Sequence, residues 1–285
     1  MSKLKIAVQK SGRLHDDSMK ILKEVGISID NGKDQLKASA RNFPLEVFYL
    51  RNGDIPQYLK DGVVDAAIIG ENLLFEKAHD LAVVERLGFS KCKVSLAIPK
   101  SGKATSIKDL EGKRIATSYP NTVNHFLKLH GIKAQLHIIN GSVEIAPNIG
   151  LADAICDIVS SGSTLFKNGL KEIQTLLTSE AVLTISPKIS AESQNILDTL
   201  RFRLQSVLRG RQNKYVLLNA PNDKLETISK ILPGMNSPTI LPLAKEGWSS
   251  LHSVINKNDF WNVIDELKAN GAEGILVCPI ENMVL

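Results

Sequence analysis

The chain has 285 residues, of which 43% are hydrophobic and 23% charged, the composition of an ordinary globular protein with room for two or three domains. Its 35 basic and 30 acidic residues leave a net charge of only +5 and form no Lys/Arg block, which argues against a nucleic-acid partner. Three widely spaced cysteines, no membrane-length apolar run and no signal-peptide core predict a cytoplasmic protein without disulfides or membrane contact.

Short apolar runs alternate with amphipathic stretches up to about residue 185, which is typical of an α/β protein with mainly parallel sheets. The predicted strands are Lys5–Gln9, Leu45–Leu50, Asp65–Ile69, Val94–Pro99, Arg114–Thr117, Gln135–Ile139 and Asp153–Val159. The predicted helices among them are Leu14–Val25, Ile55–Asp61, Val123–His130 and Ile145–Ile149. A long amphipathic helix is expected next, over Gln194–Arg211.

The remainder of the chain has a different order of predicted strands and helices. Its predicted strands are Lys214–Ala220, Thr239–Leu243, Trp248–Ile255 and Glu273–Pro279. Its predicted helices are Asp223–Leu232, closed by Pro233 and Gly234, and Asp259–Asn270, closed by Gly271. The resulting order, βαββαβ, is that of the ferredoxin-like module, so we expect a separate small domain.

A segment near residue 52 is repeated near residue 140. The stretch N-G-D-I-P-Q-Y-L-K-D-G-V-V-D-A from Asn52 aligns without a gap on N-G-S-V-E-I-A-P-N-I-G-L-A-D-A from Asn140. Each copy predicts a loop, a short helix, a glycine that ends it, and a buried strand that opens with aspartate. The repeat therefore indicates two similar α/β lobes.

We expect these lobes to resemble those of periplasmic binding proteins, which hold a ligand in the cleft beyond the carboxyl ends of their strands. The first lobe is predicted over residues 1–98, with a return segment at 181–212, and the second over 99–180. The small domain, expected to resemble the regulatory module called ACT, is predicted over 213–285.

The second copy of the repeat continues into a loop of small residues. The predicted strand Asp153–Val159 carries an acid at Asp157 and is followed by Ser160, Ser161, Gly162, Ser163 and Thr164. Such a loop at a helix N-terminus can hold a phosphate with its amides and hydroxyls, while the acid accepts from ribose hydroxyls. Serine and threonine also cap helices, so the loop alone leaves a plain helix start open.

Other polar clusters lie where a ligand cleft is expected. The first predicted strand is followed by Lys10, Ser11, Gly12 and Arg13. Arg51 follows the second strand, where it can contact a phosphate or pair with Asp54. Glu144 lies just after Asn140-Gly141, where an acid also suits a helix dipole. Each cluster taken singly is compatible with ordinary surface charges, but all of them follow the ends of predicted strands.

Long segments of the chain resemble one known family, ATP phosphoribosyltransferase in its long form. These segments are Q-K-S-G-R-L, R-N-G-D-I-P, D-G-V-V-D-A-A-I-I-G-E-N, K-R-I-A-T-S-Y-P, N-G-S-V-E-I-A-P and G-L-A-D-A-I-C-D-I-V-S-S-G-S-T-L-F-K-N-G-L. The tail segments P-G-M-N-S-P-T-I-L-P-L and G-A-E-G-I-L-V-C-P-I-E are similar to the family's regulatory domain. The resemblance runs nearly end to end.

The resemblance implies a glycosyltransferase of the first step of histidine biosynthesis. In its reaction, N1 of the ATP adenine displaces pyrophosphate from C1 of phosphoribosyl pyrophosphate and gives phosphoribosyl-ATP. Adenine N1 is already a nucleophile, so the absence of a Ser-His-Asp or Cys-His pattern is no obstacle; positioning and charge carry the catalysis. The resemblance also implies Mg²⁺, held mainly by substrate oxygens.

The resemblance further assigns roles to the polar clusters. Residues Ser160–Thr164 match the loop that holds the 5′-phosphate of the phosphoribosyl donor, with Glu144 and Asp157 near its ribose. The expected catalytic charges are Lys10, Arg13 and Arg51. The expected ATP-binding residues are Lys10, Ser11, Gly12, Arg13, Gly70 and Glu71. One departure is the segment Lys33–Lys37, which lacks an arginine found in several relatives and leaves that basic contact open.

For the tail, the resemblance implies feedback inhibition by L-histidine and a homo-oligomer between dimer and hexamer. The expected histidine-binding residues are Ser237, Pro238, Thr239, Gly271 and Ala272, in a turn and at a helix end where backbone groups are free. The rival interpretations are a non-catalytic binding protein with the same two lobes and a scaffold protein. A receptor needs a signal peptide and a transcription regulator a helix-turn-helix, and neither pattern is present.

Overall fold

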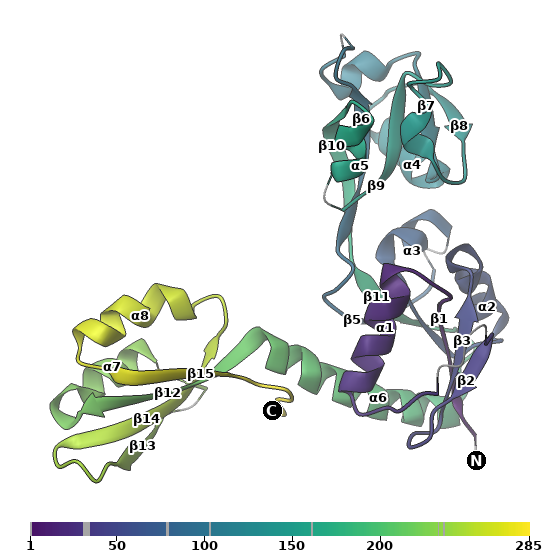
Figure 1. The fold of residues 1–285 in the computed structure, drawn as a ribbon. Coiled ribbons are helices and arrows are strands. Elements are labelled where there is room, and N and C mark those ends of the chain that lie inside the picture. The colour runs from purple at the N-terminus through teal and green to yellow at the C-terminus, as the bar shows by residue number, and fades with distance from the viewer. Residues whose placement is uncertain are drawn as a thin grey trace. The chain divides into compact units, whose positions relative to one another are not determined.

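The computed structural model describes residues 2–30, 35–77, 80–102, 104–160, 162–232, 234–235 and 237–285. The chain divides into two compact units, Met1–Asp198 and Thr199–Leu285 (Figure 1). The first unit contains a six-stranded and a five-stranded sheet, and the second contains a four-stranded sheet. None of the described helices combines the length and apolar character needed to cross a membrane.

The six-stranded sheet has the order β2-β3-β1-β4-β11-β5. Its strands are β1 Leu4–Gln9, β2 Lys37–Ser39, β3 Leu45–Leu50, β4 Ala66–Gly70, β5 Val83–Arg86 and β11 Ala181–Ile185. Its helices are α1 Arg13–Glu24, α2 Ile55–Asp61 and α3 Glu71–Lys77, with a 3₁₀ turn at Asn52–Asp54. Strand β1 pairs in parallel with β3 and β4, so the loops after these strands leave the same edge of the sheet.

The five-stranded sheet has the order β10-β6-β9-β7-β8. Its strands are β6 Cys92–Pro99, β7 Arg114–Thr117, β8 Gln135–Ile138, β9 Ala154–Val159 and β10 Leu170–Ser179. Its helices are α4 Pro120–Leu129 and α5 Ser163–Lys167, with 3₁₀ turns at Ile107–Leu110 and Val143–Ile145. The chain passes between the two sheets twice, from β5 to β6 and from β10 to β11, so each sheet is the centre of one lobe.

The second unit contains β12 Asn213–Pro221, α7 Leu225–Ile231, β13 Thr239–Pro242, β14 Trp248–Asn256, α8 Phe260–Ala269 and β15 Glu273–Pro279. A 3₁₀ turn at Asn222–Lys224 precedes α7, and α6 Ala191–Gln212 runs across the boundary of the two units. All strand pairs are antiparallel in the order β13-β14-β12-β15, which is the ferredoxin-like arrangement. The expected fold class, two α/β lobes followed by a βαββαβ unit, is confirmed.

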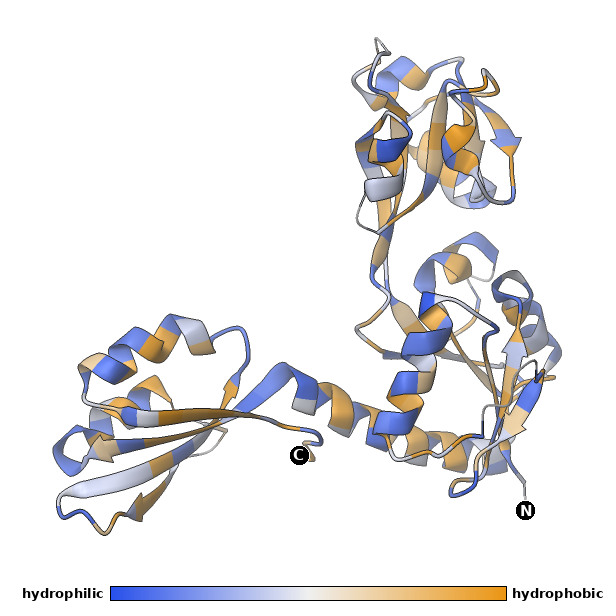
Figure 2. Ribbon diagram, viewed as in Figure 1, coloured by the Kyte–Doolittle hydropathy of each residue, from blue (hydrophilic) through white to orange (hydrophobic). Residues whose placement is uncertain are grey.

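Apolar side chains fill both faces of the second lobe's sheet. One cluster includes Leu96, Ile115 and the buried Cys156, and the other includes Val143, Ile155 and Leu165. Figure 2 shows hydrophobic residues along the strands, whereas the helices alternate between hydrophobic and hydrophilic residues. This two-sided burial explains why β9 reads as a continuous apolar run, and it makes an acid inside that strand unusual.

Several features differ from the sequence-based expectations, and the elements β2, β5, β11 and α3 were not predicted. The predicted helix Ile145–Ile149 is wrong: only Val143–Ile145 forms a 3₁₀ turn, because Pro147 supplies no amide for a further helical hydrogen bond. Strand β6, expected in the first lobe, pairs with β9 and β10 of the second sheet. The ten-residue strand β10 was not predicted, because its side chains are mostly half-buried and show no alternation. The domain boundaries themselves stay a prediction.

The internal repeat has a shared structural basis in the two lobes. Asp65 accepts a hydrogen bond from the Lys5 amide (2.8 Å), and Asp153 accepts the equivalent bond from the Arg114 amide (2.9 Å). Each aspartate amide in turn donates to the carbonyl of the same partner. The glycines before them, Gly62 and Gly150 of the repeat, have φ of 74° and 73°. The expected loop, turn, glycine stop and Asp-led strand therefore occur in both copies.

The Asp153 bond should stabilise the second lobe measurably. Its carboxylate also accepts from Nε (3.2 Å) and Nη2 (3.0 Å) of Arg114, whose side chain is the main cause of an Asp153 pKa lowered to about 2. We expect Asp153→Ala to destabilise the pairing of β7 with β9 by about 1–3 kcal/mol, as measured by native-state hydrogen exchange.

The control for this change is Asp30→Ala. Asp30 pairs with Arg41 at 2.6 Å, but both side chains are largely exposed, so its loss should cost less than about 1 kcal/mol. Equal effects of the two substitutions would show that the bond to the strand amide contributes little.

Candidate functional site

The loop after β9 lies in a small cavity with an acid from a neighbouring turn. Gly162 has a φ of 74°, a left-handed conformation that favours glycine, and α5 begins at the next residue. Ser160, Gly162, Ser163 and Thr164 line a cavity of about 120 Å³ together with Glu144. The structure thus brings together five of the residues expected to hold the phosphoribosyl donor. Ser161, also expected there, lies outside the described residues.

Asp157 is partly buried in β9, one position beyond the last residue that pairs with β7. Burial, and to a smaller extent the nearby charge of Glu144, raises the pKa of its carboxyl to about 6, although a hydrogen bond from the Ile158 amide (2.8 Å) opposes the shift. Two carboxylates close together favour a cation or hydroxyl donors between them. This is the arrangement expected beside a ribose.

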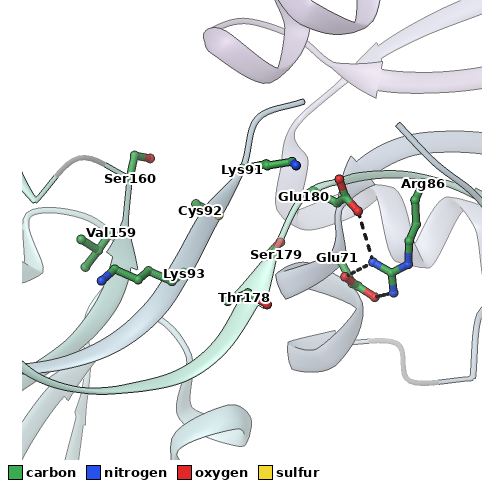
Figure 3. Close-up of a pocket in the computed structure, with 10 residues that line it drawn as sticks. All are labelled: Glu71, Arg86, Lys91, Cys92, Lys93, Val159, Ser160, Thr178, Ser179 and Glu180. Atoms are coloured by element: carbon green, nitrogen blue, oxygen red, sulfur yellow. Dashed lines mark hydrogen bonds and ion pairs between the residues drawn. The ribbon is translucent and has the colours of Figure 1, made fainter. Parts of the chain in front are cut away.

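A second cavity, of about 410 Å³, is shared by the two lobes (Figure 3). The second lobe contributes Val159 and Ser160, and the first lobe contributes Glu71 and Arg86. The start of β6 and the end of β10, with one residue beyond each of them, contribute Lys91, Cys92, Lys93, Thr178, Ser179 and Glu180. Ser160 lines both cavities, so the phosphate-type loop adjoins the space between the lobes.

Within this cavity, Arg86 makes a paired contact with Glu71. Its Nη1 and Nη2 atoms lie 2.7 and 2.5 Å from the two carboxylate oxygens of Glu71, and Nη1 lies 3.5 Å from Glu180. These contacts raise the pKa of Arg86, and Glu71 is buried. The Glu71 carboxylate, expected in the ATP site, is thus already paired with an arginine that sequence reasoning missed.

The expected basic residues of the first lobe follow adjacent strand ends. The Lys10 amide donates to the Leu50 carbonyl (2.8 Å), so Lys10 and Arg51 leave the same edge of the sheet, and both are exposed. Gly12, with φ of 90°, is the N-cap residue of α1, and Ser11 precedes it. Arg13 lies 3.9 Å from Asp17.

Arg13 also connects the first lobe with the larger cavity. Its charge lowers the pKa of Cys92, although burial has the larger effect and raises that pKa overall. Cys92 lines the larger cavity. Gly70 lies at the end of β4, where a side-chain Cβ would come within 2.4 Å of the Asn72 side-chain oxygen, so a larger residue would displace the Asn72 side chain.

Sequence reasoning missed several lining residues of the larger cavity. Lys91 and Lys93 flank Cys92 at the start of β6, and Lys93 lies 2.6 Å from Glu172. The alternation K-C-K at a strand start was the available signal, since alternate residues of a strand share one face. Arg86 offered no signal, because β5 is a short, largely exposed strand.

The residues expected to bind histidine are not brought together within one chain. Ser237 and Pro238 lead into β13, which starts at Thr239, whereas Gly271 and Ala272 lead into β15. These two strands are the opposite edges of the four-stranded sheet. The two segments of one copy therefore adjoin opposite edges of the sheet, and their role in binding histidine stays a prediction.

Two α/β lobes that share a polar cavity, followed by a ferredoxin-like unit, define a two-lobed binding fold with an added domain. The family model "ATP phosphoribosyltransferase" matches residues 51–206, and the model "HisG, C-terminal domain" matches residues 210–282. The ATP phosphoribosyltransferase of Cytophaga hutchinsonii is 53% identical over 281 residues, which cover 99% of this chain and 98% of that protein. That of Bacteroides fragilis is 51% identical over 99% of this chain and all of its own length.

A solved structure of an ATP phosphoribosyltransferase HisG:HisZ complex from Thermotoga maritima matches with a TM-score of 0.62 and 28% identity. It covers 72% of this chain and 98% of that one. The chain belongs to the ATP phosphoribosyltransferase family, the transferases of histidine biosynthesis, in its long form. The enzyme interpretation is therefore confirmed over the non-catalytic binding protein and the scaffold.

The raised pKa of Asp157 predicts a pH-dependent cost in stability. Because its folded pKa of about 6 lies above the ordinary 3.8, the folded chain binds more protons between these values, and stability should fall as pH rises through this window. Asp157→Asn keeps the acceptor for the Ile158 amide and removes the charge. We expect the variant to be more stable than the wild type at pH 8 by up to about 3 kcal/mol, and equal to it near pH 4. Urea unfolding at the two pH values measures the difference, and equal stability at pH 8 would contradict it.

Proposed function

We propose that this protein transfers the phosphoribosyl group of phosphoribosyl pyrophosphate to N1 of ATP, giving phosphoribosyl-ATP and pyrophosphate. The observation that carries the proposal is the cavity shared by Glu144 and the loop Ser160–Thr164. The family and the two-lobed fold support it. The proposal includes a cytoplasmic location, where both substrates are made and used.

In this proposal the second lobe binds the phosphoribosyl donor. The hydroxyls and amides around Gly162 contact the 5′-phosphate, which suits the turn that Gly162 makes and the exposed Thr164 hydroxyl. Asp157 and Glu144 accept hydrogen bonds from the ribose hydroxyls. Those donors compensate for the burial that raises the Asp157 pKa, so binding lowers that pKa and favours the ionised form.

In the same proposal the first lobe binds ATP and the pyrophosphate leaving group. Lys10 and Arg51 follow adjacent strand ends, and Arg13 begins α1 three residues after Lys10, which supports a role of these cations in holding the triphosphate and pyrophosphate. Gly70 and Glu71 complete this site through the turn between β4 and α3. Direct contact between ATP and the Glu71 carboxylate requires release of Arg86.

The reaction needs orientation and charge rather than a strong base. Adenine N1 attacks C1 as the bond from C1 to the pyrophosphate oxygen breaks, so positive charge develops on the sugar and negative charge on the leaving group. Asp157 and Glu144 lie where negative charge stabilises the sugar. The basic residues of the first lobe lie where positive charge stabilises the leaving group.

A Mg²⁺ ion fits this site when substrate oxygens complete its shell. No group of three or more His, Cys, Asp or Glu side chains able to hold a metal occurs among the described residues, but the charge of Glu144 acts on Asp157, so both carboxylates could offer oxygen ligands. Mg²⁺ prefers such oxygens together with phosphates and waters. When bound, the ion would neutralise charge on the leaving pyrophosphate.

We also propose that the second unit mediates inhibition by L-histidine in a homo-oligomer. Edge strands β13 and β15 carry exposed apolar residues, including Ile240, Leu241 and Leu276. Edges of this kind favour association with another chain. Because the two segments expected to bind histidine adjoin opposite edges, one binding site would need two copies of the unit.

The phosphate loop is tested by Thr164→Val. The substitution removes one hydroxyl donor while the Thr164 carbonyl, which accepts from Asn168, stays in place. We expect binding of phosphoribosyl pyrophosphate to weaken by about tenfold or more, since a hydrogen bond to a charged group contributes about 1.5–3 kcal/mol. Binding of ATP should stay within about twofold of the wild type.

The control for this variant is Thr227→Val, at an exposed position of α7 in the other unit. Isothermal titration of each variant with each ligand gives the comparison. Unchanged donor binding in the Thr164 variant would overturn the assignment of this loop.

Inhibition by histidine should not be relieved by either substrate, because the effector acts on the second unit and not in the cleft. Steady-state rates would be measured against histidine at increasing concentrations of phosphoribosyl pyrophosphate. We expect the maximal rate to fall. Inhibition that disappears at saturating donor would place histidine in the cleft and contradict the proposal.

A further inference from the structure

The N-terminus of α4, in the second lobe, is capped by an acid from the first lobe. Tyr119 occupies the N-cap position and makes no side-chain cap, and Pro120 follows it. The amides of Asn121 and Thr122 instead donate to the two carboxylate oxygens of Glu76, each at 2.9 Å. Helix amides that lack such acceptors are costly to bury, so Glu76 satisfies a need that α4 cannot meet from its own sequence.

Glu76 makes further bonds and is almost completely buried. The Thr122 hydroxyl donates to the same carboxylate at 2.8 Å, and the Asn121 side chain donates to the Glu76 carbonyl at 2.9 Å. The Glu76 residue is only 4% exposed. A carboxylate at a helix N-terminus is also favoured by the helix dipole, so the contact binds α3 of one lobe firmly to α4 of the other.

Asn72 extends this contact by one helical turn. It precedes Glu76 by four residues on α3, so the two side chains lie on one face of the helix. Its Nδ2 donates to the Tyr119 hydroxyl at 2.9 Å, and its amide donates to the Ser179 hydroxyl at 2.9 Å. The Ser179 hydroxyl in turn donates to Asn72 Oδ1 at 2.9 Å. Tyr119 and Ser179 belong to the second lobe, so Asn72 and Glu76 together make six hydrogen bonds with it through side chains or amides.

The position of this contact relates it to the proposed substrate sites. Helix α3 begins directly after β4, at Gly70–Glu71, and two residues separate the end of β7, which pairs with β9, from the start of α4. Both helix starts therefore lie at the strand edges from which the proposed ATP and phosphoribosyl sites arise. A change in the angle between α3 and α4 would change the distance between those sites.

We infer that Glu76 is a positioning residue, which fixes the two lobes at the separation that the reaction between the two substrates needs. It contacts neither proposed site and acts through α4 and Tyr119. The inference rests on the proposed division of the substrates between the lobes. It predicts that the contact matters for the reaction of two bound substrates and little for the binding of either one alone.

Glu76→Gln tests the inference with little change in shape. Glutamine keeps one acceptor oxygen but turns an NH₂ group toward a backbone donor, so one amide of α4 loses its partner. We expect kcat to fall about tenfold or more, while the dissociation constants of ATP and of phosphoribosyl pyrophosphate, each measured alone, stay within about twofold. Amide exchange at Asn121 and Thr122 should also become faster.

The matched control is Asp109→Asn, which changes a cap of the same chemistry inside the second lobe. Asp109 accepts from the amides of Thr105 and Ser106 at 2.8 and 2.9 Å. The inference expects this variant to lose stability without loss of kcat. An unchanged kcat in Glu76→Gln, or equal losses of kcat in both variants, would overturn it.

Thr122→Val provides a milder test if the glutamine variant does not fold. It removes only the hydroxyl bond to Glu76 and keeps both amides. We expect a two- to fivefold lower kcat with unchanged binding of each ligand, and a kcat equal to that of the wild type would overturn the inference. Failure of the proposed function is a separate result, because the wild-type protein itself would then form no product.

Discussion

The alignment of the central strands in each lobe depends on one hydrogen-bonded pair that occurs in both lobes. Asp65 and Lys5 in the first lobe, and Asp153 and Arg114 in the second, each exchange two bonds between the start of one strand and the start of its parallel neighbour. These bonds fix where paired strands begin, and therefore where they end. Lys10 follows β1, Gly70 ends β4 and the loop with Ser160 follows β9, so the repeated pair helps to set where these groups of the site lie.

The two lobes share this strand alignment but differ in the charge of the residues at their strand ends. The first lobe ends its strands with exposed cations, Lys10 and Arg51, whereas the second ends β9 with a partly buried acid, Asp157, and a loop of small hydroxyl residues. Reaction of a ribosyl cation-like centre with loss of pyrophosphate needs negative charge near the sugar and positive charge near the leaving group. When the two kinds of charge lie on separate lobes, the protein can supply both without one neutralising the other. Their relative placement then becomes critical, which gives the buried Glu76 contact its importance.

Much of the fold could be predicted from the sequence because the signals that define many of its strands and helices lie within the elements themselves. Strands β3, β7 and β15 have the predicted bounds, since apolar periodicity and turn residues define them directly. The phosphate-type loop was also predicted, because a glycine with positive φ and small neighbours leave a sequence signal. The long strand β10 left none, since it is half-buried along its length.

Features that depend on distant partners could not be predicted. Glu76 reads as an ordinary helix acid until its partners, 45 and 46 residues away, are known. The role of Arg86 likewise becomes clear only from its hydrogen bonds to Glu71, which follows a different strand of the sheet. The strand order, which places β13 and β15 at opposite edges of the sheet, also could not be predicted from local sequence patterns, and the histidine-binding residues stay a prediction.

The central claim is that the two lobes join two phosphorylated substrates at one bond. Mass spectrometry of a reaction containing the protein, ATP, phosphoribosyl pyrophosphate and Mg²⁺, with pyrophosphate measured in parallel, tests it most directly. The account predicts one adduct, with the combined mass of ATP and the phosphoribosyl group, for each pyrophosphate released. Release of pyrophosphate without that adduct, or an adduct formed without pyrophosphate, would contradict it.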